Sequence, residues 1–423
     1  NRALDEPYLE ELMVRNAFTA GIDFTQYFKN RLYYIEAKAM VSSLNGSREA
    51  IRALQENAVH YYQRSSSAGY LGVDPDRRSL SGTGGYLKLG RKGNAKWAFA
   101  ETFSWSSPGF DLNDIGYLKQ TDNLSNETEV AYRQTDIWKM FRYNAFTLTQ
   151  RNKWNYGGDP FYNDAALKWQ TMTMSRYELV LSETFCWNSL DSRLLRGGPD
   201  VRFDPYFLTS VKFNTDKAKR VMLTLQYEGN HNLDGFNRFN SFMPGLTFRL
   251  GNHVYLSGQV NYAWNTDNMQ FVQAAPESGT APYMTAYMDQ KTYGLTMKLQ
   301  VNVTPDISVQ FYGSPFTSTA RFSDFKSMTN TTSHTYEDRF RPLSEDEMSF
   351  IKEKPDFSFN EFRSNLVARW EYLPGSTLYF VWEHRMSDRD SHSLSGWGNN
   401  LDRMFGLPAT NTFMIKMNYW FNL

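Results

Sequence analysis

The sequence predicts an all-β protein, and three observations indicate that its strands form an antiparallel barrel in a membrane. Phe, Trp and Tyr make up 16% of the 423 residues, although the mean hydropathy is −0.57. Long segments alternate between apolar and polar side chains, and the connections between them alternate between short and long. Soluble strands are typically about five or six residues long, whereas tilted membrane strands need about 9–11. We therefore expect a transmembrane barrel of about 17–18 strands, with apolar side chains toward lipid and polar ones toward the lumen.

The alternation is clearest at the C-terminal end, in residues 409–423. The apolar positions there are Phe413, Ile415, Met417, Tyr419, Phe421 and Leu423, and Lys416 and Asn418 lie between them. The pattern recurs at 221–228, 254–264 and 293–303. Because successive side chains of a strand point to opposite faces, each segment has one apolar and one mostly polar face. A soluble sandwich is the alternative, but its inward face would not carry Lys298 or Lys416.

Short turns and long connections divide the chain into seventeen predicted strands. The short turns are expected at 29–30, 91–94, 135–139, 174–175, 216–217, 251–252, 304–305 and 374–375. The long connections are expected at 43–80, 107–121, 153–160, 188–204, 230–237, 265–285, 322–356 and 388–408. Short periplasmic turns and long extracellular loops are typical of outer-membrane barrels.

The domain organisation follows from this pattern. One barrel domain is expected over 1–423, with 43–80 and 322–356 as long extracellular loops. The first of these loops has helical spacing from Ser47 to Arg64, at Ile51, Leu54, Ala58 and Tyr61. We expect a short helix there that covers the mouth of the barrel; a helix on the membrane surface is the alternative.

The predicted strand number is odd, whereas bacterial single-chain barrels have an even number. The first strand, at about 14–27, and the last, at 409–423, would run in the same direction. We therefore expect at least one further strand between them, contributed by an N-terminal segment that this chain lacks.

The hairpin around Pro374 predicts which charged residues face the lumen. A three-residue turn would place Tyr372 opposite Leu378, Trp370 opposite Phe380 and Ala368 opposite Trp382, all toward lipid. The residues predicted to face the lumen are Arg369, Glu371, Glu383 and Arg385 on this hairpin, together with Lys298 and Lys416. In this register Arg369 and Glu383 are diagonal neighbours. We expect a belt of both charges that pair with one another; the alternative is that these charges meet only water.

Sequence motifs predict no catalytic, cofactor-binding or metal site, and therefore no enzyme. The glycine-containing segments 82–85 and 90–96 lack phosphate-binding spacing, and we interpret them as strand and hairpin glycines. The segment 111–114 resembles half of a calcium loop, but turn capping by Asp and Asn is the simpler interpretation. Arg196 fits either a loop over the pore or a turn. Cys186 is the only cysteine, which excludes an internal disulfide, and we interpret it as a reduced thiol in the lumen.

The charge balance argues against a nucleic-acid-binding protein. The 45 basic residues balance 45 acidic ones, so no basic field indicates nucleic acid.

Several local motifs resemble one known family. They are Tyr61-Tyr62-Gln63-Arg64, Asp74-Pro75 with 79–82, Ser107-Pro108-Gly109-Phe110 with 113–116, 195–199 and 370–378. In this order they resemble a large Bacteroidota outer-membrane barrel family of unknown function, whose members commonly carry an N-terminal β-sandwich similar to a carbohydrate-binding module. The sandwich is absent from this chain, and the resemblance implies no catalytic residues.

The resemblance and the barrel together lead to three functional expectations. The first is a channel or transport component for saccharides or other nutrients in the cell outer membrane. The second is a structural or assembly subunit that anchors a larger outer-membrane complex, and the third and weakest is a hydrolase built on the loops. The expected partners are outer-membrane lipid and lipopolysaccharide, and either other outer-membrane proteins or a separate N-terminal segment. No cofactor is expected.

Overall fold

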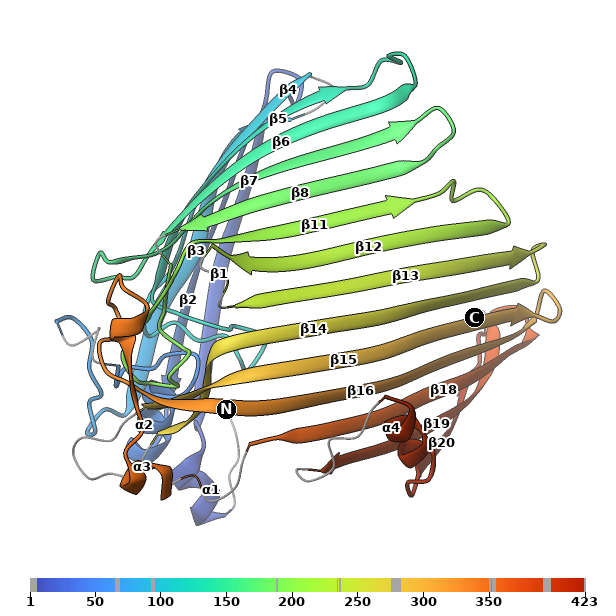
Figure 1. The fold of residues 1–423 in the computed structure, drawn as a ribbon. Coiled ribbons are helices and arrows are strands. Elements are labelled where there is room, and N and C mark those ends of the chain that lie inside the picture. Colours follow the sequence, from blue (N-terminus) through green and yellow to red (C-terminus); the bar gives the residue numbers. More distant parts are fainter. Residues whose placement is uncertain are drawn as a thin grey trace.

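The computed structural model shows an all-β chain built around one large antiparallel sheet (Figure 1). It describes residues 6–64, 69–92, 96–187, 189–233, 235, 237–274, 283–349, 351, 355–390 and 397–421. Long strands follow one another in chain order, and each pairs with its neighbours in the sequence of strands. Within these residues, no helix has the length and apolar character needed to cross a membrane.

The sheet is an up-and-down meander. Its first half contains β1 (Asn16–Phe28), β2 (Tyr33–Asn45), β3 (Ser79–Arg91), β4 (Trp97–Ser106), β5 (Asn123–Gln134), β6 (Phe141–Trp154), β7 (Pro160–Thr173) and β8 (Glu178–Trp187). Its second half contains β11 (Tyr206–Asn214), β12 (Val221–Asn232), β13 (Arg238–Leu250), β14 (Val254–Ala274), β15 (Tyr283–Asn302), β16 (Ile307–Met328), β18 (Phe357–Leu373), β19 (Ser376–Asp390) and β20 (Thr410–Asn418). Of the 18 strands in the sheet, β17 (Phe340–Pro342) is a three-residue strand on β16, so 17 form the meander, as the sequence predicts.

The remaining elements are short and lie before β1 or within the long connections. They are α1 (Pro7–Leu12), α2 (Arg48–Glu56), β9 (Ser189–Asp191), β10 (Val201–Phe203), the 3-10 helix η2 (Glu337–Arg339), α3 (Glu345–Ser349) and α4 (Trp397–Phe405). In the described residues, the eight short turns occur where they are predicted, and so do the long connections except 265–285 and 322–356, parts of which belong to strands. Parts of the predicted connections lie outside the described residues, namely 65–68, 93–94, 188, 234, 236, 275–282, 350, 352–354 and 391–396, as do Asn422 and Leu423.

Three strands are much longer than the alternation predicts. β14, β15 and β16 have 21, 20 and 22 residues, so they extend well into the predicted connections 265–285 and 322–356. Their extensions pair with one another, although β-bulges interrupt the pairing near Gln270 and Thr285. Polar side chains on both faces and these bulges hide the period of two from the sequence.

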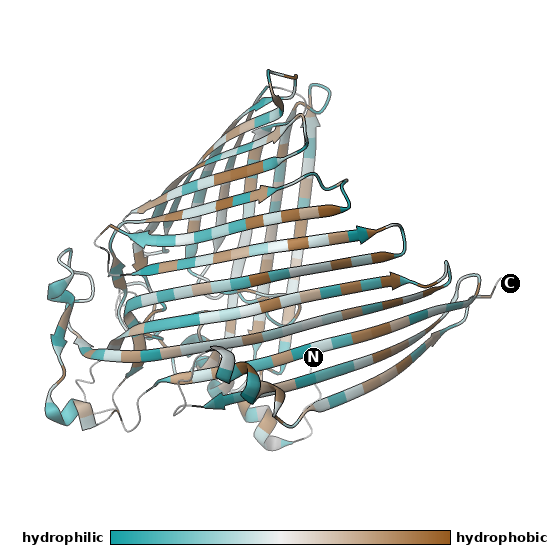
Figure 2. Ribbon diagram, turned by 45° about the vertical axis from the view of Figure 1, so that its right-hand side comes forward, coloured by the Kyte–Doolittle hydropathy of each residue, from teal (hydrophilic) through white to brown (hydrophobic). Residues whose placement is uncertain are grey.

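The pairing gives the sheet two continuous faces. The apolar face carries Phe24 of β1, Leu87 of β3, Leu148 of β6, Leu256 of β14 and Ile415 of β20, and it continues from strand to strand through directly opposed residues. The opposite face is the polar face. Figure 2 shows this alternation as brown and teal bands along the strands.

The helix in the first long loop is shorter than predicted. Ser47 caps α2, since its Oγ accepts a hydrogen bond from the Ala50 N–H at 2.9 Å. The helix ends at Glu56, so Ala58 and Tyr61 lie beyond it, and the Tyr61 backbone has a positive φ of 46°. Ile51 is fully buried against Leu80 of β3, so the helix packs on the sheet.

The predicted register of the β18–β19 hairpin is wrong by two residues. Trp370 lies opposite Leu378, Ala368 opposite Phe380, and Tyr372 falls at a register irregularity. The turn contains only Pro374 and Gly375, with Gly375 at φ 80°, and the extra residue is accommodated at Tyr372. Because the period of a strand is two, a shift by two keeps every side chain on its predicted face. Trp370 and Phe380 therefore remain on the apolar face, whereas Arg369 and Glu383 are not diagonal neighbours.

The last strand is also shorter than predicted. β20 ends at Asn418, so Tyr419 and Phe421 follow the strand and do not belong to its apolar face. Phe413, Ile415 and Met417 lie on that face as expected, opposite Trp382, Phe380 and Leu378.

The two ends of the meander are the open edges of the sheet. In the described part of the chain, β1 pairs only with β2, and β20 pairs only with β19. The sheet curves strongly, so that β1 lies behind the middle strands in Figure 1, but it does not close. Since 17 strands alternate in direction, β1 and β20 run the same way.

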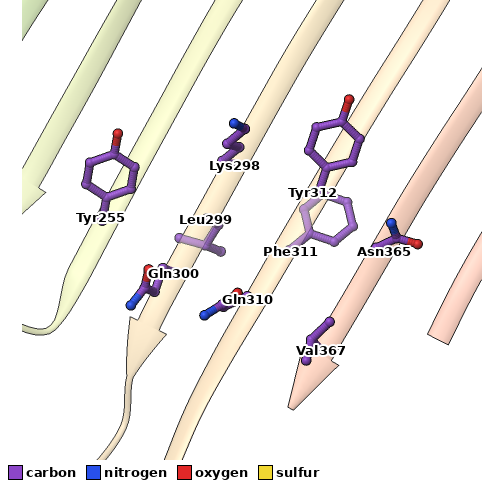
Figure 3. Close-up of a pocket in the computed structure, with 9 residues that line it drawn as sticks. All are labelled: Tyr255, Lys298, Leu299, Gln300, Gln310, Phe311, Tyr312, Asn365 and Val367. Carbon is purple, nitrogen blue, oxygen red and sulfur yellow. The ribbon is translucent and has the colours of Figure 1, made fainter. Parts of the chain in front are cut away.

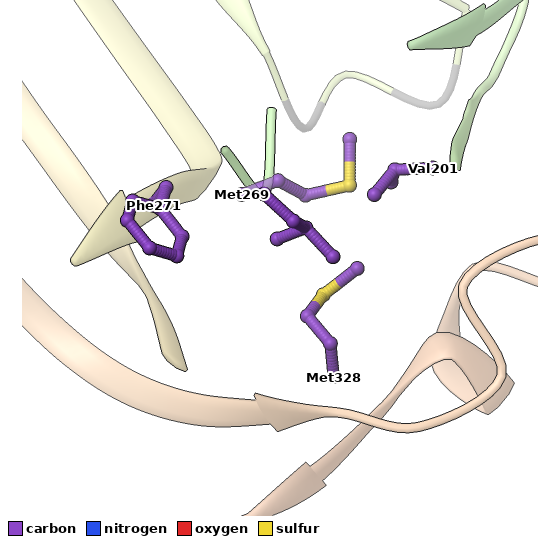
Figure 4. Packing of buried hydrophobic residues seen from close by; sticks show 5 residues of the cluster. Val201, Met269, Phe271 and Met328 are labelled. Atoms are coloured by element: carbon purple, nitrogen blue, oxygen red, sulfur yellow. The ribbon is translucent and has the colours of Figure 1, made fainter. Parts of the chain in front are cut away.

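A hydrophobic cluster fixes the long connections at the end of the sheet where β14 and β16 extend. Val201, Met269, Phe271 and Met328 are all buried there, together with Leu195 (Figure 4). Thus the segment between β8 and β11 is packed against the strand extensions.

Candidate functional site

The polar face of the sheet carries all six side chains that the sequence places in the lumen. They are Lys298, Arg369, Glu371, Glu383, Arg385 and Lys416. Tyr379 lies opposite both Arg369 and Lys416, which puts these three on one face. Asn365 lies opposite Glu383 on one side and opposite Tyr312 of β16 on the other, and Tyr312 in turn lies opposite Lys298. The register therefore brings all six onto one surface.

The charges of β18 and β19 pair with one another. Arg369 and Glu371 are two residues apart on β18, and Arg369 Nη2 lies 2.5 Å from Glu371 Oε2. The Glu371 carboxylate also accepts a hydrogen bond from the Gly375 N–H at 3.0 Å. Further along, Glu361 pairs with Arg363 at 2.8 Å and with Arg385 at 2.9 Å. Charges of both signs therefore pair on this face, but the pairs differ from the predicted Arg369–Glu383 pair because of the register shift.

A shallow depression of about 260 Å³ lies on β14, β15, β16 and β18 (Figure 3). Its polar-face lining consists of Tyr255, Lys298, Gln300, Gln310, Tyr312, Asn365 and Val367. Leu299 and Phe311 complete the lining from the apolar side of the same strands. Lys298 supplies the only charge of this lining. Amide groups both donate and accept hydrogen bonds, and tyrosine offers a flat ring with a polar tip, so the depression suits a hydroxyl-rich solute.

The polar face differs in character between two parts of the sheet. On β14 to β16 it is mostly uncharged, with Ser257, Gln259, Asn261, Thr292, Thr296, Ser308, Ser314 and Ser318 in addition to the depression. On β5 to β7 it is charged, with Glu127, Glu129, Arg133, Arg151, Lys153, Asp164 and Lys168. Arg151 and Asp164 form an ion pair at 3.0 Å. One part of the polar face therefore offers mostly neutral hydrogen-bonding groups, and the other offers charges of both signs.

Two long connections cover the polar face at β2 and β3. The Asp111 N–H donates to Ser42 Oγ of β2 at 2.9 Å, and Phe110 lies against β3. A Cβ atom on Gly82 would lie 2.2 Å from the Phe110 nitrogen, so only glycine permits this approach. Glycines at alternate positions of a strand are the sequence signal for such a contact, and the sequence interpretation of 82–85 as ordinary strand glycines missed it.

His60 joins these two connections through a buried hydrogen-bond network. Its Nδ1 lies 2.8 Å from the Pro108 carbonyl, which can only accept, so Nδ1 carries a proton. Its Nε2 lies 3.1 Å from the Asp111 carboxylate, and a hydrogen bond there requires a second, shared proton. Burial raises the pKa of Asp111, but hydrogen bonds from His60 and from the Asn113 N–H outweigh burial and hold the pKa below its usual value. Both side chains are buried, so the pair anchors the loop and is closed to substrate.

A second buried network lies beside the first. Arg64 forms an ion pair with Asp122, and the Tyr70 hydroxyl donates to the same carboxylate at 2.6 Å. The other Asp122 oxygen accepts the Tyr156 N–H at 2.9 Å, which ties a third connection to the first two. Burial and the hydrogen bond to Asp122 raise the pKa of Tyr70, so its hydroxyl stays neutral and donates.

Arg196 belongs to a turn. Its backbone has a φ of 50°, its N–H donates to the Arg193 carbonyl at 3.0 Å, and Gly197 follows with a φ of 101°. The guanidinium lies 5.0 Å from the ring centre of Phe271, over the cluster of Figure 4. Of the two interpretations left open by the sequence, the structure supports turn chemistry.

The other residues that the sequence singles out have structural roles. The Asp111 carboxylate accepts the Asn113 N–H at 2.8 Å, which confirms the turn interpretation of 111–114. No group of three or more His, Cys, Asp or Glu side chains that could hold a metal ion occurs among the described residues. Cys186 is a buried free thiol on the polar face, 3.4 Å from the Tyr162 hydroxyl.

Comparison with known proteins yields one family. Residues 11–423 match a family described as a domain of unknown function, DUF5916. A comparison with curated proteins found no significant match. Since the match spans nearly the whole sheet and its connections, the chain belongs to the DUF5916 family.

Proposed function

We propose that this chain forms the wall of an outer-membrane β-barrel and passes saccharides or other polar nutrients through its lumen. One observation carries the proposal: a mostly apolar face continues from strand to strand across 17 strands, opposite a polar face that carries ion pairs such as Arg369–Glu371 and Glu361–Arg363. This is the inverse of a soluble protein, in which apolar faces meet in a core. In a barrel, the apolar face contacts lipid and the polar face lines water.

Exposure of the apolar face supports a membrane environment. Phe18 and Ile22 of β1 are 61% and 73% exposed, and Ile415 of β20 is 72% exposed. Monomeric soluble proteins rarely expose contiguous apolar patches larger than about a few hundred Å². The strands that carry these side chains have 13 and 9 residues, which suits tilted strands across the hydrocarbon layer.

The open edges require one further element for a closed barrel. A direct pairing of β1 with β20 would be parallel, because both run in the same direction. One added strand between them would be antiparallel to both and would make the number even. Unpaired backbone groups are costly in lipid. We therefore include an eighteenth strand, supplied by a further segment or by another outer-membrane protein, in the proposed functional state.

The polar face supports the choice of solute. The depression of Figure 3 and the uncharged wall of β14 to β16 present amides, hydroxyls and tyrosine rings. These groups match the hydroxyls and the apolar ring faces of a neutral sugar. The proposal also agrees with the resemblance to Bacteroidota outer-membrane barrels, and lipid and lipopolysaccharide would be the surroundings of the apolar face.

Planar-bilayer recording and liposome swelling test the proposal together. The protein purified from outer membranes should give stable conductance steps, and liposomes that contain it should swell in a neutral disaccharide faster than empty ones. A protein that fractionates with the cytosol or the inner membrane would contradict the membrane barrel. A protein that inserts but gives neither conductance nor swelling would contradict transport alone.

An anchoring or assembly role is the second candidate. It is favoured by the connections that cover the polar face at β2 and β3, which the buried His60–Asp111 and Arg64–Asp122 pairs hold in place. A lumen closed by such connections would leave the barrel as a membrane platform. Insertion without conductance, and loss of a larger complex when the gene is deleted, would support this candidate.

A further inference from the structure

The apolar face has one polar interruption on β4 to β8. We name it the outer polar patch, and it consists of Glu101, Asn126, Gln150, Asn152, Asn163 and Glu183. Asn152 lies directly opposite Asn126 on one side and Asn163 on the other. Two carboxylates and four amides thus share a surface whose other members are side chains such as Phe103, Leu148 and Leu167.

The two carboxylates of the patch lie at the middle height of β4 and β8, whereas Asn152 and Asn163 lie nearer the strand ends, with Asn163 directly opposite Trp187. Glu101 is four residues from Trp97 and four from Trp105, which lie on the same face of β4. Glu183 is four residues from Leu179 and four from Trp187 on β8. Aromatic side chains mark the two membrane interfaces of such barrels. The proposed membrane barrel therefore puts both carboxylates near the centre of the lipid layer, where polar groups are rare and functional.

The chain satisfies these groups only in part. Glu101 accepts hydrogen bonds from Asn126 and from Thr128, the latter at 2.6 Å, and Glu183 accepts from Thr209 at 2.8 Å. The Gln150 amide donates to the Asn152 oxygen at 3.3 Å, which leaves the Asn152 amide nitrogen as an outward donor. Gln150 and Glu183 are exposed. The patch therefore presents acceptors and donors at the same time.

The chain covers polar groups of the apolar face elsewhere. Thr317 of β16 and Asn360 of β18 are on that face and are buried. The helix α4 contacts both strands there, and its Asn400 donates a hydrogen bond to Thr317 at 3.1 Å. Arg403 of the same helix pairs with Asp388 at 2.7 Å and contacts Asp390 of β19. The outer polar patch has no comparable cover in the described residues, since Gln150 and Glu183 remain exposed.

We infer that the outer polar patch is the contact surface for a second copy of this chain, an inference that rests on the proposed membrane barrel. A two-fold axis brings one patch onto the same patch of the partner, so a self-complementary surface is required. Carboxylates that accept and amides that donate meet this requirement. Polar side chains favour the association of transmembrane elements, because without a partner these side chains would be left without hydrogen bonds in hydrocarbon.

Site-specific crosslinking in isolated outer membranes tests the inference. Cys186→Ser removes the native thiol, and Gln150→Cys then places one thiol in the patch. Leu246→Cys is the matched control, an exposed apolar-face residue of β13 outside the patch. A short bismaleimide should convert the Gln150→Cys protein to a species of twice the mass and should leave the Leu246→Cys protein monomeric. Adding Asn152→Leu and Asn163→Leu should reduce the dimer at least tenfold, whereas adding Val254→Leu and Val301→Leu should leave it unchanged.

Three outcomes would overturn the second-copy contact: no dimer at Gln150, an equal dimer at Leu246, or an adduct with a different protein. A water-soluble maleimide separates this failure from failure of the membrane barrel. If Leu246→Cys is shielded from that reagent but Gln150→Cys gives no dimer, only the inference fails. If Leu246→Cys reacts readily in the native protein, the apolar face is not in lipid and the proposed function fails as well. Heat-dependent electrophoretic mobility identifies variants that do not fold.

Discussion

Arg363 of β18 and Arg385 of β19 lie directly opposite each other on the polar face, although both side chains are cationic. Like charges in directly opposed positions destabilise a strand pair. Glu361 removes this penalty because its carboxylate lies 2.8 Å from one guanidinium and 2.9 Å from the other. Since both arginines are more than half exposed, water screens the interaction, and the free energy gained is small.

Glu361→Gln should shift the ion selectivity of the proposed channel toward anions. The substitution leaves Arg363 and Arg385 as two uncompensated positive charges on the polar face, which would line the lumen of the proposed barrel. The measurement is the reversal potential in a salt gradient across a planar bilayer. Lys416→Gln is the opposite control, because it removes a cation from the same face and should shift selectivity toward cations. Equal reversal potentials for both variants would show that this wall does not line the conducting path.

Ile415→Arg should impair membrane insertion, whereas Met414→Arg should not. The two residues are adjacent on β20, but Ile415 lies on the apolar face, opposite Phe380, and Met414 lies on the polar face, opposite Val381. An arginine on the lipid face costs about 2–4 kcal/mol at the middle of the membrane and less near its surface. Denaturant titration of folded protein in lipid vesicles gives the free energy of unfolding. Similar losses for both variants would mean that the two faces of β20 are in the same environment.

Alternation predicts most of the fold because it is a property of each strand alone. It predicts the 17 strands of the meander, the position of each short turn and the face of Lys298 and Lys416. An error of two residues in the β18–β19 register leaves the faces unchanged. The predicted partners of Arg369 and Glu383 are nevertheless wrong, because partners depend on the exact length of the turn.

The loop networks could not be predicted in the same way. His60 and Asp111 are 51 residues apart, and Arg64 and Asp122 are 58 apart, so no local period relates them. The extensions of β14 to β16 are hidden for another reason, since bulges break the alternation where polar residues occupy both faces.

Acid should release the loop that Asp111 anchors. The pKa of Asp111 is lower in the folded protein than in an unfolded chain, so the carboxylate contributes stability above its unfolded pKa of about 3.9. That contribution is lost as the pH falls through the lower, folded value. Limited proteolysis of the 107–122 connection should therefore be slow from about pH 5 to about pH 7 and fast at more acidic pH. Asp111→Asn should be cleaved readily at neutral pH, and its cleavage rate should depend less on acid. The same acid dependence in both proteins would contradict the role of this carboxylate.

Gly82→Ala should displace the 107–111 segment from the polar face, whereas Gly258→Ala should change nothing. A Cβ atom at Gly82 would lie 2.2 Å from the Phe110 nitrogen and 2.5 Å from the Gly109 carbonyl carbon. Backbone atoms cannot move aside as the end of a flexible side chain can, so the segment must shift. Forcing extra atoms into a packed site costs about 1–3 kcal/mol. A Cβ at Gly258 meets nothing within 4 Å, so this variant controls for the loss of a strand glycine. If these connections narrow the lumen, single-channel conductance should rise in Gly82→Ala and stay at the wild-type value in Gly258→Ala. A lower thermal midpoint with unchanged conductance would mean that the segment stabilises the sheet without restricting the path.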